Sequence, residues 1–193
     1  DPGYSIEYLA GLVLSKLLSF YYRCVFATGS LQGSFSHVYP RHIRNLPIRT
    51  IDFSKPDDKA MHDEMVELVQ KMLEAHKRKQ AIIKEYSGWL EHLIGAKLDG
   101  LSGKDKIRDL EKLENANALA ELIAKNRKLG FNTREPRNYE LLSKGFEKYK
   151  TKLMPVVTEI AETDREIDRL VYKLYGLTEE EIEIVEGKGN PLP

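Results

Sequence analysis

The sequence predicts a mainly α-helical protein: a long antiparallel helical hairpin of the coiled-coil type, with a small α+β part at the N-terminus. Charged residues are 31% and hydrophobic residues 41% of the 193-residue chain, a composition typical of long exposed helices. From residue 55 onward, apolar residues recur at alternating spacings of three and four over about 40 residues, which is the pattern of a coiled coil. Only the stretch from 27 to 48 gathers Gly, Ser and Pro in a way that interrupts helices.

Residues 1–53 are predicted to form the N-terminal part. A helix over 5–26 is indicated by Ser5, which is a good N-cap, and by the apolar residues that follow it at helical spacing. These residues are Leu9, Leu12, Val13, Leu17 and Phe20. The apolar face of this helix is broad, so other structure should cover much of it. The alternation from Phe35 to Tyr39 then predicts one or two short strands.

Residues 54–187 are predicted to form the hairpin. Its first helix should begin after Ser54, which can act as N-cap, with Pro56 in the first turn, and should run to about Ile94. A helix of this length cannot bury an apolar seam alone, so it needs a returning helix, for which residues 139–175 are the best candidate. The seam consists of Met61, Met65, Leu68, Met72, Ala75, Lys79 and Ile82, with Val69, Ile83 and Tyr86 beside it.

Residues 96–138 are predicted to be an insertion near the tip of the hairpin, with a break at 100–104, a second helix over 104–129 and a loop over 130–138. Pro155 falls in the path of the returning helix and predicts a kink or a restart. Gly176 fits a C-terminal cap, and Thr178 with Glu181 forms a capping box for a last short helix. Residues 188–193 are predicted to be a disordered tail.

Charge and cysteine content narrow the class of protein. The net charge is zero, but residues 1–50 carry +3 and residues 155–193 carry −6, which indicates a basic face and an acidic tail. Cys24 is the single cysteine, so we expect no disulfide framework and a reduced, cytoplasmic protein. The most apolar stretch, 8–26, is interrupted by Lys16 and Arg23 and is interpreted as a buried helix rather than a membrane span. Because the chain begins with Asp1, we interpret it as a piece of a longer protein.

No catalytic or metal-binding motif is recognisable in the sequence. The run Pro56-Asp57-Asp58-Lys59 resembles the acidic–basic cluster of a metal-dependent nuclease, but its charged residues are consecutive at a helix start, where acids complement the helix dipole. The five histidines, at 37, 42, 62, 76 and 92, show no metal-ligand spacing. We therefore expect no catalytic residue, no metal site and no cofactor in this chain.

The segment from 37 to 49 carries the best candidates for a binding function. Its candidate DNA contacts are Arg41, His42, Arg44 and Arg49, because Arg can read guanine edges in a bidentate fashion and Arg or His can bind phosphate. The alternative is that these side chains are ordinary solvated surface. The second basic cluster, "HKRKQ" at 76–80, is interpreted as a solvated helix face, with tracking of phosphates as the alternative.

Two stretches taken together resemble a known family. They are "YLAGLVLSKLLSFYYR", followed by a glycine-containing loop and "HIRNLPI", and "TDREIDRLVYKLYGLTEEEIEIVEG". The family is the TaqI-like C-terminal specificity domain of adenine-specific DNA methyltransferases. It includes fused type IIG restriction-modification enzymes and is related to the specificity subunits of type I restriction systems. The resemblance covers residues 4–80 and 155–187 but not 96–150, and Leu14 stands where the family often has Asn.

The resemblance implies a function for the chain and for its parent. The parent would be an N6-adenine DNA methyltransferase that binds S-adenosylmethionine and flips an adenine. The resemblance also implies that the parent binds Mg²⁺ and that any nuclease lies elsewhere in the parent chain. This chain would be the DNA-reading end, with residues 1–53 as the C-terminal part of a target-recognition domain and the hairpin as a stiff spacer. Its partners would be double-stranded DNA, the methyltransferase domain of the same parent and a second copy in a homodimer, with no membrane. The competing interpretation is a helical coiled-coil scaffold or protein-interaction module without DNA binding, for which the basic segment at 37–49 would have no use.

Overall fold

The computed structural model describes residues 3–26 and 39–188, and within them it is mainly α-helical without any strand. The chain divides into two compact units: unit 1 comprises residues 1–73 and 162–193, and unit 2 comprises residues 74–161. The helices are α1 (Ile6–Leu14), α2 (Lys16–Phe26), α3 (Pro40–Arg44), α4 (Pro56–Ile94), the 3₁₀ helix η1 (Leu98–Gly100), α5 (Lys104–Arg108), α6 (Ala116–Ala124), α7 (Pro136–Tyr175) and α8 (Glu179–Val185).

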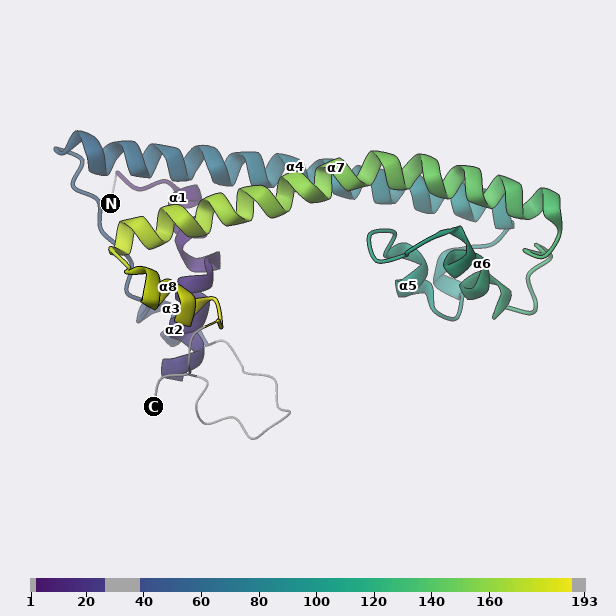
Figure 1. Ribbon diagram of the computed structural model, residues 1–193, viewed down its shortest axis with the longest axis horizontal. Helices are drawn as coiled ribbons and strands as arrows, with labels where there is room; N and C mark the ends of the chain where they lie inside the picture. Colours follow the sequence, from purple (N-terminus) through teal and green to yellow (C-terminus); the bar gives the residue numbers. More distant parts are fainter. Residues whose placement is uncertain (1–2, 27–38, 189–193) are drawn as a thin grey trace. The chain divides into compact units, whose positions relative to one another are not determined.

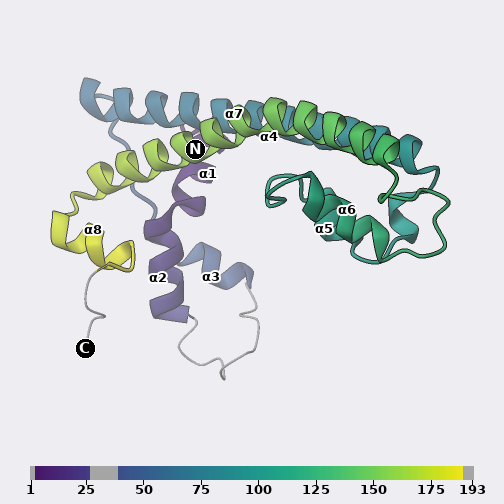
Figure 2. The ribbon, with the colours of Figure 1, turned by 45° about the vertical axis from the view of Figure 1, so that its right-hand side comes forward.

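Helices α4 and α7 form the predicted antiparallel hairpin and lie side by side in Figure 1 and Figure 2. In unit 1, the ammonium of Lys71 lies 3.2 Å from the carboxylate of Glu166. In unit 2, Arg78 pairs with Glu159 at 2.6 Å, and Lys152 pairs with Glu85 at 3.5 Å. Each step of seven residues along α4 is thus matched by seven residues back along α7. Exposed ion pairs of this kind contribute little stability, but they show which residues of α4 and α7 face each other within each unit.

The core of unit 1 is formed where α1 crosses the paired helices. Buried apolar side chains of α1, α4 and α7 meet there; they are Tyr8, Leu12, Met65, Val69, Ile167, Leu170, Val171 and Leu174. Gly11 is buried against Met65, and a Cβ at this position would overlap the Met65 side chain. The absence of a side chain at Gly11 therefore lets α1 approach α4 closely.

The prediction of a single helix over 5–26 is wrong. The structure has two helices there, α1 and α2, with a bend of 61° between them at Ser15. The Ser15 hydroxyl donates to the carbonyl of Leu12 at 2.7 Å and accepts from the amide of Leu18 at 3.3 Å. Asp168 of α7, which is buried, accepts from the backbone amide of Lys16 at 2.9 Å, and its second oxygen lies 2.9 Å from the Lys16 ammonium. The helix ends and restarts because these groups satisfy the orphan backbone groups at both ends of the break.

Among the described residues, no single helix has the length and apolar character needed to cross a membrane; α1 and α2 satisfy those criteria only when they are taken together as a bent pair.

Unit 2 buries its core between the hairpin and the short helices α5 and α6. The predicted continuous helix over 104–129 is wrong, since α5 ends at Arg108 and Asn115 caps α6 by accepting from the amide of Ala118 at 3.0 Å. The intervening segment is held instead by Lys150 of α7, whose ammonium donates to three backbone carbonyls at 2.6–2.9 Å. These carbonyls, of Leu110, Glu111 and Leu113, thereby find a partner outside a helix.

The helix ends agree with the predictions at several positions. Ser5 caps α1, Gly176 ends α7 in the left-handed region with φ +67°, and Thr178 with Glu181 forms the predicted capping box of α8. Ser54 does not cap α4, because its hydroxyl donates to Asp52 at 2.6 Å while Lys55 immediately precedes the first helical residue. The returning helix begins earlier than predicted, at Pro136, and continues through Pro155 without restarting.

The strand predicted for the N-terminal part spans 35–39, of which only Tyr39 is among the described residues. Residues 35–38 of the predicted strand lie outside the described residues, as do 189–193 of the predicted tail. Tyr39 is extended and is followed by helix α3, although the sequence predicted no helix between residues 27 and 48. Pro40 accounts for this turn, because proline has a fixed φ that suits the first position of a helix.

Candidate nucleic-acid interface

The four predicted DNA contacts divide between α3 and the segment that follows it. Arg41, His42 and Arg44 lie on α3, and Arg49 lies in the extended segment between α3 and α4. All four belong to unit 1. Their surroundings differ, and the difference separates side chains that face solvent from side chains that hold the fold together.

His42 anchors α3 to α2 through a cluster of aromatic rings. Its ring stacks on Phe26 with centroids 4.7 Å apart and an interplanar angle of 7°, and Tyr39 meets it edge-on at 5.3 Å. Its Nδ1 lies 3.1 Å from the hydroxyl of Tyr22. Its Nε2 accepts from the Nε of Arg41 at 3.4 Å. His42 therefore fixes the orientation of α3.

Arg41 and Arg44 are the solvent-facing cations of α3. Both are exposed, and at a spacing of three residues they lie on the same side of the helix. The guanidinium of Arg41 lies 5.2 Å from the centroid of the Tyr39 ring, a cation–π contact that limits its freedom. Within residues 3–26 and 39–188, neither side chain forms an ion pair with a carboxylate. Two guanidinium groups are thus presented together without an internal acid.

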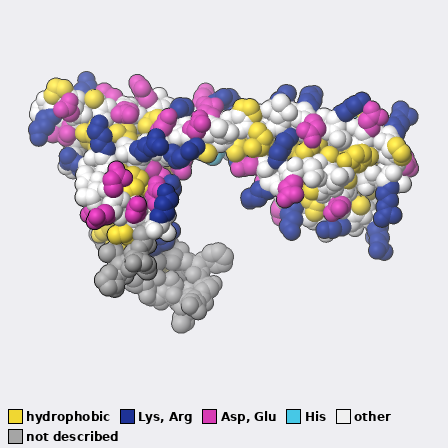
Figure 3. Space-filling view, viewed as in Figure 1, with side chains coloured by type: hydrophobic (Ala, Val, Ile, Leu, Met, Phe, Trp, Pro, Cys, Tyr) yellow, Lys and Arg dark blue, Asp and Glu magenta, His cyan; other side chains and the backbone are white. Residues whose placement is uncertain are grey.

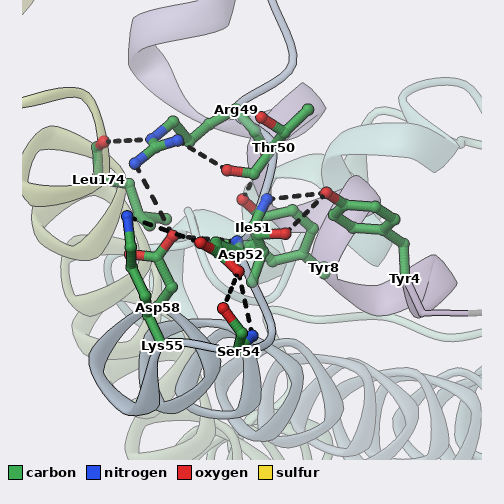
Figure 4. A network of polar contacts seen from close by, with 10 residues as sticks. All are labelled: Tyr4, Tyr8, Arg49, Thr50, Ile51, Asp52, Ser54, Lys55, Asp58 and Leu174. Carbon is green, nitrogen blue, oxygen red and sulfur yellow. Dashed lines mark hydrogen bonds and ion pairs between the residues drawn. The ribbon is translucent and has the colours of Figure 1, made fainter.

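Arg49, by contrast, is engaged in a network of polar contacts within unit 1 (Figure 4). Its Nε donates to the carbonyl of Leu174 at 3.2 Å, and its Nη1 donates to the carbonyl of Thr50 at 2.7 Å. Its Nη2 lies 3.9 Å from Asp58. The Leu174 carbonyl belongs to the last turn of α7, where a cation complements the negative end of the helix dipole. Arg49 thus links the end of α7 to the start of α4.

Three tyrosines hold the backbone around Arg49 in an extended course. Tyr8 donates to the carbonyl of Arg49 at 2.9 Å, and the amide of Arg49 donates to Tyr175 at 3.1 Å. The hydroxyl of Tyr4 accepts from the amide of Ile51 at 2.7 Å (Figure 4). Burial raises the pKa values of Tyr8 and Tyr175 above their usual range. The sequence did not identify these tyrosines, because their spacing carries no signal and the contacts join segments 41 to 126 residues apart.

The acidic residues at the start of α4 serve the same junction. The carboxylate of Asp58 accepts from the amide of Asp52 at 3.0 Å, and Asp52 accepts from the amide of Ser54 at 3.1 Å. The hydrogen bond from the Ser54 hydroxyl, and after it the one from the Ser54 amide, lower the pKa of Asp52. In the part of the chain that the structure describes, no three His, Cys, Asp or Glu side chains are placed to hold a metal ion together.

Comparison with known proteins gives a family for most of the hairpin. Residues 58–171 match the family described as "Domain of unknown function (DUF8810)". The chain belongs to this family. No curated protein and no solved structure matches it. The DUF8810 segment begins in the first turn of α4 and ends in α7, so it contains all of unit 2, whereas Arg41, His42, Arg44 and Arg49 precede it.

The second basic cluster predicted from the sequence, 76–80, lies within the DUF8810 segment. Arg78 pairs with Glu159 across the hairpin, and Lys79 pairs with Glu111. Lys77 is exposed. Two of the three cations of this cluster therefore have acidic partners within unit 2, and they are less available to a phosphate than Arg41 and Arg44.

Proposed function

We propose that this DUF8810 protein is the DNA-specificity part of a restriction-modification enzyme. In this proposal it carries the C-terminal part of a target-recognition domain and positions double-stranded DNA for an N6-adenine methyltransferase in the same parent chain. S-adenosylmethionine, and Mg²⁺ for a nuclease where the parent has one, would be bound outside this chain. The part described here would contribute recognition and spacing rather than catalysis.

The observation that carries the proposal is the pair of exposed guanidiniums on α3. Arg41 and Arg44 share one side of a helix, they lack an acidic partner among the described residues, and His42 holds the helix that carries them against α2. Exposed guanidiniums on a helix that is held in place suit contacts to guanine edges or phosphates, because arginine presents a planar pair of donors that fits both. A purely structural role does not need this arrangement.

The hairpin supports the proposal as a spacer. Within each unit α4 is paired with α7 by ion pairs between facing residues, and such paired helices are stiff. A specificity module needs such a segment, because the methylated base must lie at a fixed distance from the bases that are read. The methyltransferase domain of the parent would then be the protein partner of the hairpin.

A fluorescence-anisotropy titration of duplex DNA tests the proposal. We expect Arg41→Ala/Arg44→Ala to weaken binding and to lower the salt dependence of the affinity, because cations that contact phosphate release counterions. Lys59→Ala/Lys84→Ala, which removes two exposed cations of α4, is the matched control and should bind like the wild type. Equal affinity of the α3 variant and the control at every salt concentration would refute the assignment of DNA contacts to α3.

The second candidate function is a helical scaffold without DNA binding. Exposed apolar side chains on the hairpin favour it: Leu73 is 52% exposed and Leu141 is 47% exposed. A scaffold that pairs with itself would form a homodimer. Sedimentation velocity at several concentrations separates the two functions, since a concentration-dependent dimer with no DNA affinity at low salt would favour the scaffold.

A further inference from the structure

Two adjoining depressions lie in unit 2 near the end of α4. The first, of about 420 Å³, is lined by Gly88, Glu91, His92, Gly95, Ala96 and Lys97. The second, of about 480 Å³, lies beside η1 and the segment after α6, and its lining residues are Ala96, Lys97, Gly100, Leu101, Asn126, Arg127, Lys128 and Leu129. Because both contain Ala96 and Lys97, they form one open groove, here called the tip groove. Figure 3 shows Lys and Arg side chains along the edge of this part of the molecule.

The tip groove is cationic. Lys97, Arg127 and Lys128 are exposed along it, and within the described ranges Arg127 and Lys128 form no ion pair. Glu91 is the single acid among the lining residues, and it is neutralised locally. Its carboxylate pairs with Lys97 at 2.7 Å and accepts from the amide of Leu98 at 3.0 Å, and these two contacts lower its pKa.

Glycines leave the tip groove open toward the backbone. A Cβ on Gly88, Gly95 or Gly100 would meet no atom within 4 Å among the residues described. At Gly95 the backbone itself requires glycine, because its φ of +66° lies in the left-handed region and ends α4. At Gly88 the backbone does not require glycine. This residue lies in the interior of α4, where glycine weakens a helix, and no described neighbour occupies the space that a side chain would fill. A ligand that approaches the α4 backbone closely would explain it.

The walls of the tip groove are held in place by Asn126. Its Oδ1 accepts from the amide of Ser102 at 2.8 Å, and its Nδ2 donates to the carbonyls of Ser102 and Leu122 at 3.3 and 3.2 Å. The segment that carries Arg127 and Lys128 is thereby joined to the chain that follows η1. The cations therefore stand on a fixed backbone, which reduces the entropy lost when they bind a ligand.

We propose that the tip groove binds the sugar–phosphate backbone of duplex DNA. Arg127 and Lys128, two cations without an acidic partner among the described residues, lie beside an open groove, which suits a polyanionic chain better than a small molecule, because small ligands are usually buried in enclosed pockets. The inference rests on the proposed function, since it places a second, sequence-independent contact on the same partner. This contact lies in the DUF8810 segment, outside the four side chains predicted from the sequence.

The test is a salt series of anisotropy titrations with duplex DNA on the full chain. Arg127→Ala/Lys128→Ala removes two candidate phosphate contacts and should lower the slope of log affinity against log salt by roughly 1.8 for two contacts. Gly88→Leu fills the groove without removing a charge. It should keep or raise the melting temperature, since leucine favours the helix, while it weakens DNA binding. Lys59→Ala/Lys84→Ala again serves as the charge-matched control and should leave the slope unchanged.

Three results would overturn the inference: unchanged DNA binding in both groove variants, an equal loss in the control, or no affinity of the wild type for DNA even at low salt. The outcome is separable from that of the α3 proposal. Binding that survives Arg41→Ala/Arg44→Ala but falls in Arg127→Ala/Lys128→Ala would sustain the tip groove and refute the contacts on α3. The reverse pattern would sustain α3 and refute the groove.

Discussion

Gly145 is the position at which the packing of the hairpin can be tested most sharply. It is buried in α7 under the indole of Trp89, and a Cβ would overlap the six-membered ring of that side chain. The ring cannot swing aside freely, because Tyr86 and Tyr149 pack on it with centroids 6.0 and 5.5 Å away. Alanine gains about 1 kcal/mol of intrinsic helix stability over glycine, but overpacking of a filled site costs about 1–3 kcal/mol. The net effect of Gly145→Ala should therefore be a destabilisation of up to about 2 kcal/mol.

Gly88→Ala provides the matched control in the same hairpin. Gly88 is exposed in the interior of α4 with open space at its Cβ position, so the substitution should stabilise the protein by about 1 kcal/mol. Urea unfolding followed by circular dichroism measures both changes, and each kcal/mol should move the melting temperature by about 2–4 °C in a chain of this size. Changes of the same sign in the two variants would refute the argument, as would a failure of Trp89→Leu to relieve the cost of Gly145→Ala in a double-mutant cycle.

Three further predictions concern polar groups within the individual units. The hydroxyl of Tyr172 is buried without a hydrogen-bond partner among the described residues, and burial raises its pKa from 10.0 to about 12. The stability that comes from keeping this hydroxyl neutral is complete below pH 10 and is lost as the pH rises towards 12. Tyr172→Phe should therefore be neutral or stabilising at pH 7 and should delay alkaline unfolding. A pH titration of ellipticity would show both effects. Lys150→Met removes three charge-assisted hydrogen bonds to backbone carbonyls and should lower the free energy of unfolding, measured in urea, by about 2–3 kcal/mol. A decrease below about 0.5 kcal/mol would show that water replaces the ammonium. Arg49→Lys keeps the charge but loses the planar fork, so it should lower the melting temperature, whereas Arg44→Lys should not; equal effects would contradict a structural role for Arg49.

The hairpin could be predicted from the sequence because its signal is local and repeated. The alternating spacings from Met61 onward define one face of α4, and Met65, Val69, Ala75 and Tyr86 of that face are buried. Capping residues are equally local, so the end of α7 at Gly176 and the start of α8 at Thr178 followed from the sequence. A long helix with an apolar seam then requires a partner, and α7 was the remaining segment of sufficient length.

The breaks could not be predicted, because distant residues cause them. The bend at Ser15 depends on Asp168, which is separated from Lys16 by 152 residues and reaches it only in the folded chain. The irregular segment between α5 and α6 likewise depends on the Lys150 ammonium. In each case the local sequence is compatible with a continuous helix, but a side chain of α7 forms hydrogen bonds with backbone groups at the break, and the helix is interrupted there.

The candidate site shows the same division between local and long-range information. Composition identified Arg41, His42, Arg44 and Arg49 as one basic group, but their roles differ because their neighbours differ. The acceptors around Arg49 come from α7 and α4, and the rings around His42 come from α2 and the residue before α3.

Of these four side chains, Arg41 and Arg44 are the two with no comparable partner among the described residues, and a cation that contacts DNA must be available in this way before binding. The tip groove follows the same logic in unit 2, where Arg78 and Lys79 are paired with acids while Arg127 and Lys128 are not. Unpaired cations on a braced backbone are therefore the feature that the two proposed DNA surfaces share. Because each surface is braced within its own unit, each can be altered without disturbing the other, and the two double variants should reduce DNA affinity independently.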